Sequence, residues 1–255
     1  MNTQTSMLFG GLLLAATFNA QATLTTYTNT GADLVYSSVS DVTWTADANL
    51  LGTMMNQQGY GNVVGAILAV TSVIYDTPNS LDTPANSGQY TLSSGDFSAS
   101  TYGQTNWFGA IAFINYLNSI NYGGGNQWRL PSAGTNPQAD TGQTTSELGQ
   151  LYYTELNGIG GNGNALPDSS FFINEPGVGG TNWTGTEAQN PRSAWTFNLN
   201  NGNQSTTRKN SATVGVWAIS SGQIAPVPLP GAAWLFASGL AGLIGYRKRT
   251  FAGIQ

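Results

Sequence analysis

Two uncharged apolar runs, one near each end of the chain, most limit what this sequence can fold into. The first extends from Met7 to Phe18, and the second extends from Gly231 to Tyr246. Both are expected to be processing segments rather than parts of a globular core. The folded part is therefore expected within residues 23–223, which is long enough for one packed domain.

The N-terminal run is typical of a secretory signal peptide, here over residues 1–22. Ala20 and Ala22 flank Gln21 in a small-x-small cleavage pattern directly after the run. The run is short for a permanent membrane helix. No Lys or Arg precedes it, which departs from the usual pattern. We expect export by the Sec machinery and a mature chain that begins at Thr23; the alternative is an N-terminal core helix.

The C-terminal run belongs to a three-part tail over residues 224–249. A Pro-bracketed motif precedes the run and a basic cluster follows it, and their residues are Val227, Pro228, Leu229 and Pro230, then Arg247, Lys248 and Arg249. The uncharged, Gly- and Ala-rich run suits a transmembrane helix, and the basic cluster is expected on the cytoplasmic side. Residues 250–255 would be a short cytoplasmic end.

This tail resembles the PEP-CTERM sorting signals of Gram-negative bacteria, in the variant written VPLPA-CTERM. Gly231 stands where that variant has Ala. The resemblance implies processing by an exosortase, a membrane protease-transpeptidase, in a biofilm and exopolysaccharide setting. It also implies a cell-surface or extracellular-matrix location after transient anchoring in the inner membrane. The alternative is a plain tail anchor.

The composition excludes several classes of chemistry. The chain has no Cys and no His, so disulfides, thiolate metal sites, Ser-His-Asp catalysis and His-ligated zinc hydrolysis are excluded. Charged residues make up only 7% of the chain and the net charge is -5. A cationic surface for nucleic acid is therefore absent. We expect no nucleic-acid partner, no cofactor and no metal.

Hydrophobic periodicity predicts two helices within the folded part. The clearer one extends from Thr105 to about Ile120 with apolar residues at three-four spacing, and the second extends from Thr145 to Leu156 with Thr145 or Ser146 as its N-cap. Asp47 is a predicted N-cap of a further short helix. Residues 76–100 are rich in Ser, Asp, Asn, Gly and Pro, which indicates a loop-rich insertion. Strand-like pieces lie at 34–36, 42–44, 171–173, 182–184, 194–199 and 214–220.

These pieces, in this order, resemble the Lcl C-terminal domain family, which is related to the C-type-lectin-like and formylglycine-generating-enzyme folds. W-R-L-P at Trp128–Pro131 followed by Glu147 and Leu148 is the most specific match. No Arg follows Val216, where the family usually has one. The resemblance implies an α+β, C-type-lectin-like domain with two helices and short antiparallel strands. The other matching segments are Asp41–Trp44, Trp107–Leu117, Asn182–Glu187, Ala194–Phe197 and Val216–Ala218.

Arg129 is the basic residue most clearly placed for a structural role. It lies between Trp128 and Leu130 in a stiff segment, and a rigid guanidinium fork suits pairing with a carboxylate such as Glu147. The alternative is a cation that binds a ligand. We predict that Trp128, Arg129 and Glu147 support the fold.

Trp183 has the best claim among the Trp residues to be an exposed ligand platform, because it follows a Gly- and Asn-rich loop. Its neighbour Asn182 and the preceding Glu175 are the other candidate ligand-binding residues. Glu175-Pro176 is similar to the Glu-Pro-Asn motif of calcium-dependent lectins, but Gly177 replaces the Asn and too few oxygen ligands are near in sequence.

The function expected from these features is non-enzymatic. The chain is interpreted as an exported surface or matrix protein that binds a glycan, such as extracellular polysaccharide, or another partner through its lectin-like domain. Two alternatives stay open. One is a structural matrix component with no defined ligand, and the other is an exported hydrolase that uses Asp and Glu.

Overall fold

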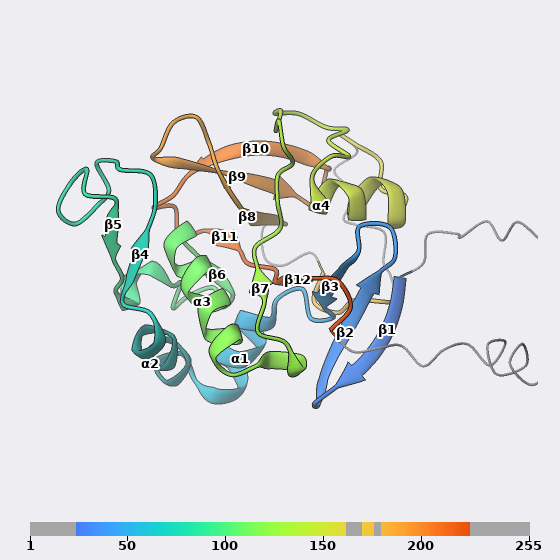
Figure 1. Cartoon of the computed structure of the whole chain (residues 1–255), viewed down its shortest axis with the longest axis horizontal. Helices are drawn as coiled ribbons and strands as arrows, with labels where there is room; N and C mark the ends of the chain where they lie inside the picture. The colour runs from blue at the N-terminus through green and yellow to red at the C-terminus, as the bar shows by residue number, and fades with distance from the viewer. Residues whose placement is uncertain (1–23, 162–169, 176–179, 225–255) are drawn as a thin grey trace, which may run out of the picture.

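The computed structural model describes residues 24–161, 170–175 and 180–224, and Figure 1 shows their arrangement. The predicted cleavage site at Ala20 and Ala22 lies outside these residues, as do the sorting motif, the predicted transmembrane run and the basic cluster. Among the described residues no helix is long and apolar enough to cross a membrane. The chain has an α+β fold.

The first sheet contains strands from both the beginning and the end of the described chain. Its strand order is β1-β2-β3-β12-β7, and all neighbours are antiparallel. β12 lies between β3 and β7, where Ile219 pairs with Trp44 on one side and Arg129 on the other. The strands are β1 (Leu24–Asn29), β2 (Ala32–Ser37), β3 (Val42–Thr45), β7 (Trp128–Arg129) and β12 (Ile219–Ser221).

The second sheet has the order β10-β9-β8-β11-β6 and is antiparallel except where β8 meets β11. β8 is irregular between Trp183 and Glu187, where its register against β9 shifts. The turn Asn200-Asn201-Gly202 connects β9 to β10. The strands are β6 (Gln104–Thr105), β8 (Thr181–Glu187), β9 (Ser193–Asn198), β10 (Asn203–Arg208) and β11 (Val214–Gly215).

The described residues form four α-helices, where the family resemblance implied two, and three further short helical segments, η1 to η3. The predicted helix at 105–120 is confirmed as α3 (Trp107–Ser119), which Asn106 caps by accepting from the amide of Gly109. The second predicted helix begins as α4 (Glu147–Gly149) with Ser146 as its cap and continues as a π-helix, η3 (Gln150–Glu155). The remaining elements are α1 (Leu50–Gln58), α2 (Tyr60–Val70), η1 (Ser94–Asp96) and η2 (Tyr122–Gly124).

Asp47 is not the N-cap that the sequence predicts. α1 begins later, after Asn49, and the Asp47 carboxylate instead accepts hydrogen bonds from the amide of Asn49 and the hydroxyl of Thr53. Asp47 therefore supports the start of α1 from two positions before the N-cap residue Asn49. The predicted strand at 171–173 is reduced to a single bridge between Ile173 and Asp47.

The predicted loop-rich region at 76–100 is closely integrated into the domain. β4 (Val73–Tyr75) and β5 (Gln89–Thr91) form a separate hairpin around its first part. Leu92 and Phe97 are buried in the core with α2 and α3, and Asp82 and Asp96 are buried as well. Figure 1 shows this hairpin on the opposite side of the molecule from β1 and β2.

Two hydrophobic clusters hold the sheets and helices together. The larger one packs α1, α2 and α3 against both sheets. The smaller one surrounds Trp44 and Trp217, whose ring centroids are 4.9 Å apart and whose side chains are fully buried. The Nε1 atom of Trp217 donates to the Thr45 carbonyl at 2.9 Å. This hydrogen bond links the segment between β11 and β12 to β3.

Candidate functional site

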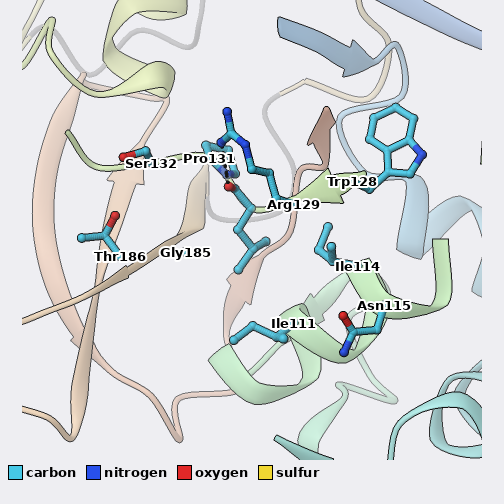
Figure 2. Close-up of a pocket in the computed structure, with 10 residues that line it drawn as sticks. Ile111, Ile114, Asn115, Trp128, Arg129, Pro131, Ser132, Gly185 and Thr186 are labelled. Atoms are coloured by element: carbon cyan, nitrogen blue, oxygen red, sulfur yellow. Dashed lines mark hydrogen bonds between the residues drawn. The ribbon is translucent and has the colours of Figure 1, made fainter. Parts of the chain in front are cut away.

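One groove has a volume of about 450 Å³ (Figure 2). It is lined by residues of α3, by β7 and the three residues that follow β7, and by residues of β8. Its walls are largely apolar and include Ile111, Ile114 and Leu130, whereas Asn115 and Thr186 are polar. We call it the Arg129 groove. In Figure 2 the Arg129 side chain points away from Ile111 and Ile114. The groove therefore offers a ligand little beyond apolar contact.

Arg129 and Glu147 form the ion pair that the sequence predicts. Both terminal guanidinium nitrogens donate to the carboxylate, at 2.7 and 2.6 Å, and the amide of Ser132 donates to the same carboxylate at 2.6 Å. The Arg129 side chain is 37% exposed and that of Glu147 is 19% exposed, so the pair is only partly shielded from water. Trp128 is also structural, since it is buried and donates to the Tyr122 carbonyl.

Replacing Arg129 by alanine is expected to destabilise the domain by about 1–2 kcal/mol, between the values for exposed and buried ion pairs. The cost stays below that of a buried pair because Glu147 keeps its bond from Ser132. Arg208→Ala is the matched control, since Arg208 is exposed. Thermal unfolding of both variants checks this, and equal melting temperatures would contradict it.

A second, larger groove of about 680 Å³ lies between the β1–β2 hairpin, α1 and the segment at 170–173. We call it the hairpin groove. Hydroxyl, amide and carboxylate groups line it together with aromatic rings, which distinguishes it from the Arg129 groove. Those residues are Thr26, Thr28, Thr53, Gln57, Gln58, Asp33, Asp47, Tyr27, Tyr122 and Phe171.

The two carboxylates of the hairpin groove are held in different ways. Asp47 is buried, and its oxygens accept three hydrogen bonds, from the amide of Asn49 and from the side chains of Thr53 and Asn174. Asp33 is exposed and accepts from the Thr28 hydroxyl at 2.6 Å. Asp47 is therefore a fixed acceptor that shapes the wall, while Asp33 is open to a ligand.

Tyr122, the first residue of η2, is one of the aromatic residues that line the hairpin groove. Its ring packs edge-on against Trp128, with centroids 5.9 Å apart. Burial raises the pKa of Tyr122 to about 12, and the nearby charges of Asp47 and Asp33 act in the same direction. The hydroxyl therefore stays protonated at all physiological pH values and can donate a hydrogen bond.

The predicted ligand-binding role of Trp183 is wrong. Its side chain is completely buried, and its Nε1 atom donates to the Thr105 carbonyl at 3.0 Å, so it is a core residue between α3 and the second sheet. Asn182 is also buried, at 2% exposure. Glu175 is half-buried and follows the bridge between Ile173 and Asp47. The three residues do not form a common surface site.

No family model, curated protein or solved structure matches the chain. Among the described residues, no group of three or more carboxylates is arranged to hold a metal ion.

Proposed function

We propose that the chain is an exported surface or extracellular-matrix protein that binds polysaccharide in the hairpin groove. The observation that carries this proposal is that residues with hydroxyl, amide and carboxylate side chains line one groove together with Tyr27 and Tyr122. Sugars offer many hydroxyls beside apolar ring faces, so they are recognised by polar side chains together with aromatic surfaces. No enzymatic step is part of the proposal.

The export and sorting parts of this proposal rest on the chain ends. A signal peptide over residues 1–22 would deliver the domain through the Sec machinery. The motif at 227–230, the apolar run and the basic cluster would then present it to an exosortase in the inner membrane. A chain with only 7% charged residues suits a matrix of neutral polymers.

The finer fold proposal is a C-type-lectin-like domain. The pairing of β12 with β3 supports it, because strands from the start and the end of the domain then share one sheet. The antiparallel short strands and the two predicted helices also agree with it. A hydrolase is less well supported, because Asp47 is buried and its carboxylate already accepts three hydrogen bonds.

Replacing Tyr122 by phenylalanine is expected to weaken polysaccharide binding by roughly three- to tenfold, the equivalent of one lost hydrogen bond. The ring and its packing on Trp128 are retained. Tyr75→Phe is the control, because Tyr75 is 74% exposed and lies outside the groove. Calorimetric titration of the full chain with exopolysaccharide from a biofilm-forming bacterium measures both.

Two results would contradict the proposed function. Absence of binding to any polysaccharide would favour a structural matrix component, and shortening of the polymer during the titration would favour a hydrolase.

Gln57→Ala provides a second test at the same wall of the groove, since Gln57 is exposed and its loss does not disturb the core. It is expected to weaken binding without a change in melting temperature.

A further inference from the structure

Lys209, directly after β10, has a completely buried side chain. Its Nζ atom donates to Asp76 Oδ2 at 2.5 Å and to Glu187 Oε2 at 2.7 Å. The Asp76 side chain is fully buried too, and that of Glu187 is 28% exposed. One amine and two carboxylates thus meet inside the domain.

The surroundings of these three groups are apolar. Lys209 Nζ lies 4.6 Å from the centroid of the buried Trp107 ring, and Phe108 lies beyond it at 5.9 Å. Asp76 Oδ1 is buried and accepts no hydrogen bond from the described residues. Charges are costly in such a place because water cannot solvate them.

The backbone and side chains around the cluster keep its reacting atoms in place. The Lys209 amide donates to the Arg192 carbonyl, and the Lys209 carbonyl accepts from the Trp107 amide, both at 2.9 Å. The Asn79 side chain donates to Asp76 Oδ2, and the Thr77 amide donates to Glu187. Amine and carboxyl are therefore held together at contact distance, which removes most of the entropic barrier to a reaction between them.

An amine and a carboxyl group condense to an amide when the amine is neutral and the carboxyl is protonated. Transfer of one proton from the ammonium to the carboxylate inside a dry pocket produces this pair and removes both buried charges. Burial raises the pKa of the Asp76 carboxyl, and the charges of Asp82 and Glu187 add to this, although Lys209 acts in the opposite direction. The pocket thus favours the reactive protonation state of the acid.

We propose that Lys209 Nζ and Asp76 Cγ become joined by an intramolecular isopeptide bond. The Nζ lone pair attacks Cγ, the bond from Cγ to one carboxyl oxygen breaks, and that oxygen leaves as water. Glu187 takes a proton from the attacking nitrogen and returns it to the departing oxygen. No oxidant or other reagent is consumed, since one water molecule is the only product besides the amide.

The bond would join two residues that lie 133 positions apart in the chain. It would connect the segment after β4 to the segment after β10, across elements that are otherwise joined only by packing and hydrogen bonds. A cross-link that closes so long a loop restricts the unfolded chain strongly. In a chain without Cys it would serve where disulfides are not available, and reducing agents would not break it.

This inference does not rest on the proposed polysaccharide site. Asp76 follows β4, whose hairpin lies on the opposite side of the molecule from β1 and β2 (Figure 1). An experiment that disproves polysaccharide binding would therefore not disprove the isopeptide bond, and the reverse also holds.

Mass spectrometry of the folded full chain tests the bond. The mass is expected to be lower than the sequence mass of the same processed form by one water molecule. A protease digest is expected to contain one branched peptide that carries both Asp76 and Lys209, with Lys209 resistant to trypsin. A full sequence mass together with separate peptides for the two residues would overturn the proposal.

Three variants define the chemistry. Asp76→Asn is expected to form the same amide with loss of ammonia instead of water, and Asp76→Ala is expected to retain its full mass. Glu187→Gln is expected to keep its full mass while folding normally by circular dichroism, because glutamine cannot take the proton. A branched peptide in folded Asp76→Ala would overturn the assignment of Asp76, and one in Glu187→Gln would overturn the role of Glu187.

Discussion

Replacing Lys209 by methionine is expected to lower the free energy of unfolding by about 3–5 kcal/mol. Methionine has a similar length and fills the space beside Trp107, so little packing is lost. Asp76 and Glu187 would, however, face each other without a cation, and Asp76 has no access to water. Loss of the ion pair alone accounts for this cost. Loss of the proposed amide cross-link adds to it, because the cross-link restricts the unfolded chain.

The expected decrease in Tm is about 6–20 °C at this chain size. Arg208→Met is the matched control, since Arg208 is the adjacent basic residue and is exposed. Its effect is expected to stay within about 0.5 kcal/mol. Adding Asp76→Asn and Glu187→Gln to Lys209→Met should restore part of the stability, because the stranded charges are then gone. Equal melting temperatures for Lys209→Met and Arg208→Met would contradict the buried-charge explanation.

Replacing Trp217 by alanine is expected to cost about 3–5 kcal/mol, as for other buried aromatic truncations. Trp217 is fully buried between Trp44 and Phe172, with ring centroids 4.9 Å away in both directions. The variant would leave a large cavity and would also deprive the Thr45 carbonyl of its hydrogen bond from Nε1. Chemical unfolding followed by circular dichroism measures the change.

Trp195→Ala is the control for the Trp217 variant. Trp195 lies on β9 in the second sheet and is half-buried, so its truncation is expected to cost clearly less. Trp44→Phe gives a further comparison, because the Trp44 Nε1 atom is buried without a hydrogen-bond partner among the described residues. Its loss removes no bond, and a smaller cost than that of Trp217→Phe is expected. The reverse order would contradict the role assigned to the Trp217 indole.

The parts of the fold that follow from hydrophobic spacing were predictable. α3 has an apolar face at three-four spacing and an Asn cap, so local sequence and tertiary packing agree on it. The pairing of Arg129 with Glu147 was also predictable, because a guanidinium in a stiff segment is well suited to a bidentate pair with a carboxylate. The π-helical turn η3 after α4 has no comparable local signal.

The polar and charged interior could not be predicted in the same way. β10 has the sequence NQSTTR, which has no apolar face, and its inward residue Gln204 is buried through hydrogen bonds to the carbonyls of Ala133 and Gln138. Lys209 lies in the same polar run, where exposed charge is the ordinary expectation. Its partners Asp76 and Glu187 are distant in sequence, and only the tertiary fold brings them together.

Trp183 shows the opposite error. A Gly-rich loop before an aromatic residue suggested exposure, but β8 carries that residue directly into the core. The proposed polysaccharide site instead uses residues such as Tyr122, Gln57 and Asp33, which come from three separate elements. Their spacing in sequence carries no common pattern, so the site emerges only when the β1–β2 hairpin packs beside α1.

The measurement that tests the proposed function most directly is an NMR titration of the isotopically labelled chain with a defined oligosaccharide of the matrix polymer. The proposal predicts that chemical shifts change first at Gln57, Gln58 and Tyr122, and that Tyr122→Phe weakens the response while Tyr75→Phe does not. Shift changes confined to the Arg129 groove, at Ile111 and Thr186, would contradict the assignment of the site. No shift change with any matrix oligosaccharide would contradict polysaccharide binding itself.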